Sequence, residues 1–372
     1  FETLCTQLGA GGKGANLQKY YVTYAQEKGE SPGVWSGQAS KELGLEGEVK
    51  AEDMQKILQG FAPDGKALCK NAGEEHRGGW DLTFSAPKSV SIAWVNADLE
   101  LRKKIEEAHE KSVQIGMKYF QEHSAITRTG DQGDNREKAD LVYALFQHSS
   151  NRAEEPQLHT HSIVFNVAKT QSDDKWRTLE SRDIYKSVMA ASAFYKASFS
   201  HELQKMGIEV ERTKDSFEIV NIPKDVCKAQ SSRSQTIEEE LKKRGLDRDS
   251  ASAKSKEAAN LSTRAKKENI TRDFDRWQKE NSEYGFGPNE QKEAFKNLGK
   301  DLTKEIKIED KEKIVENSLE NLTMRDSTFT VHKLNREIAE NAIGKLNIEE
   351  IGNSIKNAFE KTNDILEKKQ QE

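Results

Sequence analysis

The stretch FQHSSNRAEEPQLHTHSIVF, which spans Phe146–Phe165, decides the fold of this chain. It contains His148, His159 and His161, three of the eight histidines in the sequence. Side chains two residues apart on a β-strand point to the same face, so His159 and His161 share a face if this part is a strand.

Apolar runs on both sides of the stretch predict two strands. Leu141–Phe146 ends just before His148, and residues 163–167 follow His161. Two neighbouring antiparallel strands would bring the three imidazoles together. Three neutral imidazoles leave open positions on a divalent metal, as a catalytic site requires. A histidine pair at this spacing is often incidental, but the third histidine in the preceding strand favours metal binding.

The composition limits the class of protein. The 372 residues suffice for two or three domains, and 34% hydrophobic with 33% charged residues predicts a core in part of the chain and solvated helices elsewhere. No apolar run approaches the ~20 residues of a transmembrane helix, and no secretory signal opens the sequence as given. Cys5, Cys69 and Cys227 lie far apart without a CxxC motif. They predict reduced thiols in a cytoplasmic protein and no cysteine metal site.

The charge is unevenly distributed. Residues 228–276 hold thirteen Lys/Arg against nine Asp/Glu, a net charge of +4 in a chain whose total is −5. The total argues weakly against a nucleic-acid partner, but a local basic segment can bind phosphate inside an acidic protein.

Apolar periodicity predicts strands mixed with helices, as in an α+β or α/β layer structure. We expect a strand at Leu82–Pro87, a helix or strand at Ser89–Trp94, long helices at Leu99–Glu122 and Ser187–Met206, and a hairpin of Ile208–Glu211 with Phe217–Val220.

Two changes of character along the chain predict three domains. Residues 1–227 alternate strands and helices and form the first. Residues 228–296 are rich in Lys, Arg, Ser and Glu and predict helices that project from the core. Residues 297–372 form a small, charged helical domain, in which Asp326–Leu334 predicts a capped helix start.

Three tyrosines and one aspartate add chemistry. Tyr20, Tyr21 and Tyr24 lie close together, which alone favours the aromatic face of a helix. Free tyrosine, with a pKa near ~10, is a poor nucleophile unless a metal-bound phosphate and a nearby carboxylate assist it. Asp81 opens an apolar strand, where an acid is usually solvated or capping. Lys88 stands where a helix could begin, which suits phosphate oxygens.

Together these motifs resemble one family. They are WDLTFSAPKSVS with Asp81, FQHSSNRAEEPQLHTHSIVFNV with the three histidines, the Tyr20–Tyr21 pair, and WSG at 35–37 followed by LGLEG at 43–47. The sequence resembles the F-type (TraI/TrwC-like) conjugative relaxases of the HUH endonuclease class, over residues 1 to about 290.

The resemblance implies an α+β fold: a palm with a central antiparallel sheet flanked by helices, helical fingers and a small C-terminal helical domain. It implies nicking of one strand of plasmid DNA at the transfer origin. A tyrosine becomes joined to the 5′ phosphate, the 3′ hydroxyl is released, and the strand is rejoined after transfer. Tyr20 is the first candidate nucleophile, Tyr21 the second and Tyr24 the third. Asp81 either accepts the tyrosine proton or orients a metal ligand.

The cofactor implied is a divalent metal on His148, His159 and His161: Mg²⁺ or Mn²⁺, with Zn²⁺, Ni²⁺ or Co²⁺ as alternatives. The partners implied are single-stranded or hairpin transfer-origin DNA, accessory proteins of the relaxosome, and the coupling protein of a type IV secretion system. We expect a monomer in the cytoplasm of the donor cell, carried to the recipient with the DNA.

Candidate DNA contacts are spread along the chain. Arg152 either contacts DNA or pairs with a neighbouring glutamate, and Trp176 either packs or stacks on a base. The other candidates are basic residues that could equally be solvated: Lys88, Arg233, Arg264, Lys266 and Lys267.

Two other classes of function compete with the relaxase. One is a metal-dependent phosphodiesterase that uses water and needs no tyrosine. The other is a non-catalytic DNA-binding module with a structural metal. The sequence holds no Walker A motif. The chain is therefore expected to have no ATPase of its own. The resemblance, together with the lack of a clear stop signal at the end, predicts the N-terminal part of a longer relaxase-helicase, with the last domain leading toward the helicase.

Overall fold

A computed structural model describes residues 4–8, 19–24, 29–151, 153–246, 255, 258–259, 272–326 and 328–371. Five candidate DNA contacts lie outside these residues or have no described side chain. Arg152, Arg264, Lys266 and Lys267 lie outside them, as does part of the expected fingers. The side chains of Tyr24 and Arg233 are likewise not described.

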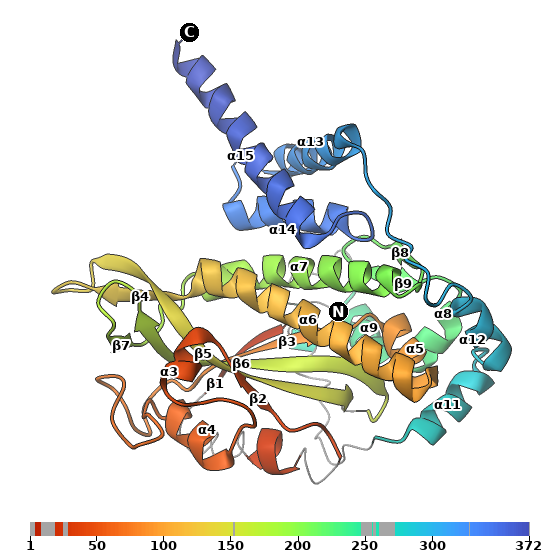
Figure 1. Cartoon of the computed structure of the whole chain (residues 1–372), viewed down its shortest axis with the longest axis horizontal. Coiled ribbons are helices and arrows are strands. Elements are labelled where there is room, and N and C mark those ends of the chain that lie inside the picture. Colours follow the sequence, from red (N-terminus) through yellow and green to blue (C-terminus); the bar gives the residue numbers. More distant parts are fainter. Residues whose placement is uncertain are drawn as a thin grey trace.

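The described residues form a large antiparallel sheet, as expected (Figure 1). Its strand order is β1-β3-β6-β5-β2, with β4 paired to β5 and β7 paired to β6. The strands are β1 (Leu4–Leu8), β2 (Val34–Ser36), β3 (Gly79–Ser85), β4 (Ile126–Thr129), β5 (Asn135–Ser150), β6 (Pro156–Thr170) and β7 (Trp176–Arg177). The two strands predicted from the apolar runs are β5 and β6, and they pair along most of their length.

Helices cover both faces of this sheet. The long helices α6 (Leu99–Ser124) and α7 (Ile184–Lys205) lie over one face, and α4 (Ala51–Leu58) lies over the other (Figure 1). Helix α3 (Gln38–Glu42) follows β2, and a helical turn, η1 (Lys19–Tyr24), carries the tyrosines. The antiparallel sheet flanked by helices confirms the expected α+β fold.

Alternation along the strands sorts side chains between the two faces. Trp80, Leu82 and Phe84 of β3 join the apolar core under α6 and α7. Ile163 and Phe165 of β6 join a second core on the opposite face. Polar residues between the first three must therefore point toward the second face, because successive strand residues point in opposite directions.

A glycine at the start of β3 allows two strands to approach closely. Gly79 has φ 149, in a region that residues with a side chain rarely adopt. A Cβ atom added there would lie 2.1 Å from the carbonyl oxygen of Val164 on β6. The absence of a side chain at Gly79 therefore lets β3 join β6 at this point.

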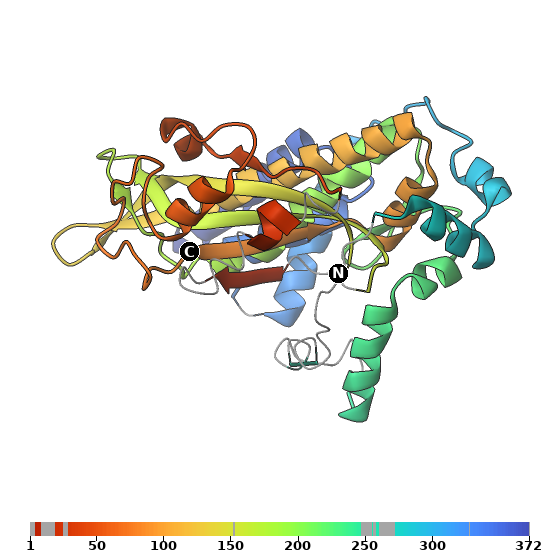
Figure 2. The ribbon, with the colours of Figure 1, turned by 90° about the horizontal axis from the view of Figure 1, so that it is seen from below.

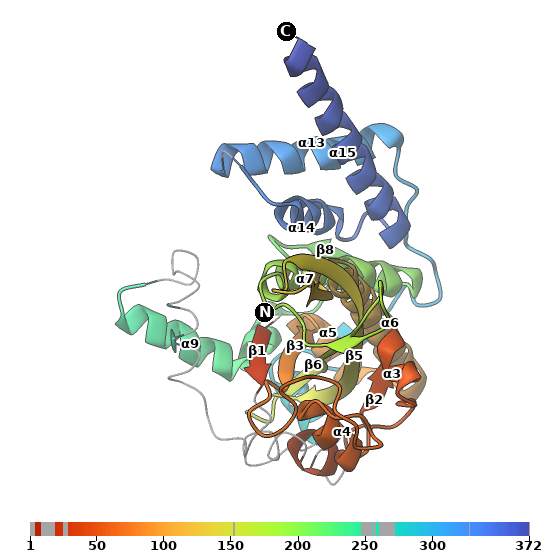
Figure 3. The same ribbon diagram turned by 90° about the vertical axis from the view of Figure 1, so that its left-hand side faces the viewer.

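The smaller predicted elements are also present. Helix α5 (Lys88–Asn96) decides between helix and strand for residues 89–94. The expected hairpin consists of β8 (Val210–Arg212) and β9 (Phe217–Ile219). The segment after it contains α8 (Lys224–Ala229), α9 (Ser232–Lys243), α11 (Phe274–Glu283) and α12 (Pro288–Ala294). Helix α9 extends away from the sheet, in line with projecting helices (Figures 2 and 3).

Three helices form a layer on α7. They are α13 (Ile308–Arg325), α14 (Val331–Ala342) and α15 (Ile348–Gln371), and α14 lies directly on α7 (Figures 1 and 3). The expected cap is present, because the side chain of Thr330 accepts a hydrogen bond from the Lys333 N–H. The expected boundary after residue 227 falls inside α8, and the division into three domains stays a prediction. Among the described helices, none combines the length and apolar character needed to cross a bilayer.

Candidate metal centre

Three histidines converge on the face of the sheet opposite α6 and α7. The register pairs His148 of β5 directly with His159 of β6, and His161 lies two residues further along β6. One ring nitrogen from each lies within 4.8 Å of the others. His148 and His159 are buried. The structure thus brings together the three imidazoles that the sequence predicted to converge.

The hydrogen bonds of these rings leave nitrogen atoms available for a metal. Nδ1 of His159 lies 2.8 Å from the carbonyl oxygen of Gln157, and Nδ1 of His161 lies 2.9 Å from Oδ2 of Asp81. Both nitrogens of His148 are buried without a hydrogen-bond partner among the described residues. A buried imidazole is expected to be satisfied, and a metal ion would satisfy this one. The residues present therefore fit a divalent metal.

The protonation state of the buried histidines also suits metal binding. Burial, reinforced by the two neighbouring imidazoles, holds the pKa of His148 well below its ordinary value. Burial and then His161 lower the pKa of His159 to about 3. Both rings are therefore neutral near pH ~7, the form in which imidazole binds metals.

Asp81 connects this cluster to a tyrosine. Its carboxylate accepts hydrogen bonds from the Tyr21 hydroxyl at 2.8 Å and from the Thr83 hydroxyl at 3.3 Å, besides its contact with His161. Burial would raise the pKa of Asp81, but His161 and the three hydrogen bonds outweigh burial and lower it. The carboxylate is therefore charged and lies between the tyrosine and a candidate ligand, so both roles expected for Asp81 fit its geometry.

Of the three clustered tyrosines, Tyr20 and Tyr21 have described side chains, and these differ in position. Tyr21 is buried, and its hydroxyl also lies 3.3 Å from Nδ1 of His161. Its ring stacks over His148 with centroids 6.0 Å apart. Tyr20 is half-buried and lies edge-on to Tyr21 at 4.9 Å and to His148 at 5.9 Å. Both rings therefore border the cluster, and Tyr21 has its hydroxyl on Asp81.

Two further candidates have internal partners. Lys88 is buried, its ammonium donates to the carbonyl oxygen of Pro156 at 2.8 Å, and burial lowers its pKa to about 8. The next residue of α5, Ser89, donates its N–H to Glu218 at 3.2 Å, so a carboxylate already occupies this helix start. Trp176 is half-buried and packs against the second core. Neither Lys88 nor Trp176 belongs to the histidine cluster, and DNA binding by either stays a prediction.

Sequence reasoning missed the residues that hold the loop between the histidine strands. Glu155 accepts the N–H of Ser232, the first residue of α9, at 2.7 Å. The carbonyl oxygen of Glu154 accepts from the Trp277 indole at 2.8 Å and from Arg276 at 2.6 Å, both in α11. Helices α9 and α11, which lie on either side of residues 247–271 in the sequence, thus both form hydrogen bonds with the loop between β5 and β6. No local sequence pattern signals contacts over such separations.

Glu30 was missed as well. Its carboxylate accepts both the N–H and the hydroxyl of Ser149, next to His148, at 2.9 and 2.6 Å. Burial raises the pKa of Glu30 against the lowering effect of these hydrogen bonds. Glu30 ties the segment that follows the tyrosines to the histidine strand.

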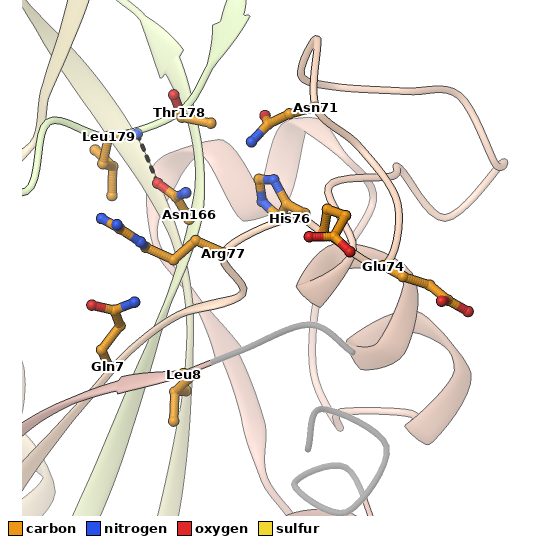
Figure 4. A pocket seen from close by; sticks show the side chains of 10 residues that line it. Gln7, Leu8, Asn71, Glu74, His76, Arg77, Asn166, Thr178 and Leu179 are labelled. Carbon is orange, nitrogen blue, oxygen red and sulfur yellow. Dashed lines mark hydrogen bonds between the residues drawn. The ribbon is translucent and has the colours of Figure 1, made fainter. Parts of the chain in front are cut away.

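A cavity of about 570 Å³ lies elsewhere, beside the start of β3 (Figure 4). Its lining is mostly polar and includes none of the histidines of the cluster. The lining residues are Gln7, Leu8, Asn71, Glu74, Glu75, His76, Arg77, Asn166, Thr178 and Leu179.

Comparisons with known proteins agree with this geometry. The family described as TrwC relaxase matches residues 9–284. The multifunctional conjugation protein TraI of Escherichia coli (strain K12) is 34% identical over 295 residues, which are 74% of this chain and 16% of the relative. A second TraI, from Escherichia coli, is 34% identical over 277 residues, 70% of this chain and 15% of the relative. The chain thus spans about one-sixth of the length of these relatives.

Solved structures of TrwC are similar as well. A copper-bound conjugative relaxase TrwC in complex with oriT DNA has 32% identity and a TM-score of 0.67, covering 76% of this chain and 99% of that one. A metal-bound TrwC–oriT complex has 33% identity, a TM-score of 0.66 and the same coverage. The match over residues 9–284 and the identity to its members establish that this chain belongs to the TrwC relaxase family.

Proposed function

We propose that this chain is a conjugative relaxase, a metal-dependent transesterase that nicks one strand of plasmid DNA at its transfer origin and later rejoins it. The observation that carries the proposal is the contact of Tyr21 with Asp81 beside three converging histidines. It combines a nucleophile, a proton acceptor and ligands for a divalent metal in one site.

His148, His159 and His161 would hold the metal, which would neutralise charge on the non-bridging oxygens of the scissile phosphate. A neutral imidazole set accepts several divalent metals, so its chemistry does not select one. Mg²⁺ or Mn²⁺ is our first expectation, with Zn²⁺, Ni²⁺ or Co²⁺ as alternatives.

The residues of the chain would perform the transfer itself. The tyrosine oxygen attacks phosphorus, its proton passes to Asp81, and the bond from phosphorus to the 3′ oxygen breaks. The 3′ oxygen leaves as a hydroxyl after taking up a proton. One phosphodiester is exchanged for another, so the reverse attack by a 3′ hydroxyl rejoins the strand.

Tyr21 is our proposed nucleophile on the strength of its 2.8 Å hydrogen bond to Asp81. Family pattern favours Tyr20 first, and the half-buried Tyr20 ring beside His148 keeps it as the alternative. Tyr24 remains the third candidate. Only the tyrosine with access to a proton acceptor should form the adduct efficiently.

The rest of the chain would serve DNA binding. We propose that residues 1–227 form the palm, residues 228–296 the DNA-covering fingers and residues 297–372 a helical domain. The solved TrwC complexes with oriT DNA support single-stranded or hairpin DNA as the partner. We propose that relaxosome accessory proteins and a secretion coupling protein are further partners, in the donor cytoplasm.

A covalent trapping assay tests the proposal. The purified chain is incubated with Mn²⁺ and a library of 3′-labelled single-stranded oligonucleotides with a randomised centre, and products are separated on a denaturing gel. We expect a labelled protein–DNA adduct that EDTA prevents and His148→Ala lacks. Cleaved DNA without adduct would support the hydrolase instead, and binding without cleavage would support the DNA-binding module.

Matched phenylalanine variants then identify the nucleophile. Tyr21→Phe should abolish the adduct, whereas Tyr20→Phe should retain it, since each variant removes one hydroxyl and keeps the ring. Loss in Tyr20→Phe alone would make Tyr20 the nucleophile. Loss in Tyr24→Phe alone would rule out both.

A further inference from the structure

A buried histidine lies on the other side of the strand that carries two of the candidate ligands. His109 of α6 has Nε2 2.9 Å from the hydroxyl of Thr160 on β6. Its Nδ1 lies 2.9 Å from the hydroxyl of Tyr195 on α7. His109 and Tyr195 are fully buried, and Thr160 is 4% exposed. The three side chains form a polar chain from the helix layer to the sheet.

Thr160 stands between His159 and His161 in the sequence. Its side chain points toward α6, while both neighbours point to the metal face, as alternation along a strand requires. A twist or slip of β6 at Thr160 would therefore move two candidate ligands together. The hydrogen bond between His109 and Thr160 holds the strand at the residue where such a movement would matter most.

The surroundings of His109 favour one orientation of its ring. Tyr195 and Phe199 pack against the imidazole, each with ring centroids 5.5 Å away. Both hydrogen-bond partners are hydroxyls, which can donate or accept, so a neutral imidazole is satisfied at both nitrogens in either tautomer. An apolar residue here would leave two buried hydroxyls to find new partners.

We propose that His109 is a positioning residue, which holds Thr160 so that His159 and His161 keep the spacing needed by the metal. This inference rests on the proposed metal-binding function of the three histidines. The hydrogen bonds of His109 go to Thr160 and Tyr195 on the helix side of β6, so it holds the candidate ligands in place through the strand.

Two variants of His109 test the proposal. His109→Leu fills a similar space without hydrogen bonds, and His109→Gln keeps an amide that can reach Thr160. Mn²⁺ affinity of the metal-free chain is measured by titration calorimetry at a temperature where each variant is folded. We expect His109→Leu to weaken Mn²⁺ binding by about 10-fold, as losses of groups that orient ligands do, and His109→Gln to restore most of it.

The absorption spectrum of the Co²⁺-loaded chain gives a second readout. Its visible bands report the arrangement of the ligands around the ion. A variant that only lowers the stability of the fold would leave these bands unchanged. We expect His109→Leu to shift these bands and His109→Gln to leave them near those of the wild type.

Ser112 offers a matched control on the same helix. It is fully buried and donates to the carbonyl oxygen of Ala108 at 2.7 Å and to Ser198 at 3.2 Å, and neither bond reaches β6. Ser112→Ala should lower stability and leave Mn²⁺ affinity and the Co²⁺ spectrum unchanged. Thr160→Val removes the same hydrogen bond from the strand side and should reproduce His109→Leu, also where His109→Leu fails to fold.

Two results would overturn the positioning role of His109, and they can be told apart. Wild-type metal affinity and spectrum in both His109→Leu and Thr160→Val would overturn the positioning role while leaving the proposed function intact. If the wild-type chain binds no Mn²⁺ or Co²⁺, the proposed function fails and this inference fails with it.

Discussion

The Tyr21 hydroxyl donates to Oδ2 of Asp81 at 2.8 Å, and Nδ1 of His161 lies 2.9 Å from the same oxygen. One carboxylate oxygen thus contacts a candidate nucleophile and a candidate metal ligand. The charge of Asp81 would orient His161 and also receive the tyrosine proton, so the two roles left open by the sequence are compatible in a single residue.

Asp81→Asn should show how much of the role of Asp81 depends on its charge. The amide keeps the size of the side chain but loses the charge that attracts the tyrosine proton and orients His161. We expect adduct formation to fall by about 10²–10⁴-fold and metal affinity by about 10-fold, measured by gel trapping and titration calorimetry. Thr83→Val, which removes the 3.3 Å bond to Oδ1 and the 3.2 Å contact with Nδ1 of His161 but keeps the charge of Asp81, is the control and should have a much smaller effect. Wild-type adduct formation in Asp81→Asn would mean that the proton leaves by another route.

His109 should make the chain sensitive to acid. Burial, followed by the neighbouring His159, lowers the pKa of His109 to about 3, against an ordinary value of 6.5. Below pH ~6.5 the unfolded chain takes up a proton that the folded chain does not, so stability is complete above that pH and falls toward pH ~3. At about pH 4.5 the loss of unfolding free energy reaches about 3 kcal/mol.

Urea unfolding of His109→Gln checks this expectation. Glutamine does not titrate, so the difference in unfolding free energy between about pH 7.5 and about pH 4.5 should be about 2–3 kcal/mol smaller than in the wild type. The other histidines are common to both proteins and cancel in the comparison. An unchanged difference would mean that His109 is not the titrating group.

The sequence predicted most of what is local in this fold. Apolar runs located β5 and β6, and the two-residue spacing put His159 and His161 on one face. Helix α5 remained ambiguous for a physical reason: every residue from Lys88 to Val95 is buried, so the helix has no polar face and hence no helical periodicity.

Contacts between distant residues were beyond sequence reasoning. His109 and Thr160 are 51 positions apart, and Glu30 and Ser149 are 119 apart. Each is an isolated polar residue whose role depends on a partner brought near by packing. The tyrosines were found as a cluster, but which hydroxyl reaches Asp81 on β3 depends on how η1 lies against the sheet, and single-sequence patterns do not encode that.

The hydrogen bond between α9 and the end of the loop that joins β5 to β6 predicts that Glu155 stabilises the fold. Its carboxylate accepts the N–H of Ser232 at 2.7 Å and the amide of Asn151 at 2.7 Å. Glu155→Gln weakens both bonds by removing the charge, so we expect a loss of about 1 kcal/mol of stability and faster hydrogen exchange at the Ser232 amide. Exchange is measured by mass spectrometry. Glu239→Gln, at an exposed position of α9, should change neither.

Gly79→Ala should be among the most damaging single substitutions in the sheet. The added Cβ would meet the carbonyl oxygen of Val164 at 2.1 Å and Cα of Phe165 at 3.0 Å, and backbone atoms cannot move aside as a side chain can. The positive φ of 149 adds strain. We expect a loss of at least about 3 kcal/mol, measured by urea unfolding.

Gly44→Ala separates the clash from the strain. Gly44 also has a positive φ, of 70, but nothing lies within 4 Å of its added Cβ. This variant should lose only about 1 kcal/mol, the cost of the backbone conformation. Equal losses in the two variants would mean that β3 and β6 can separate at Gly79 without cost. Because β3 carries Asp81 two residues later, a partly folded Gly79→Ala should also lose Mn²⁺ affinity, whereas Gly44→Ala should keep it.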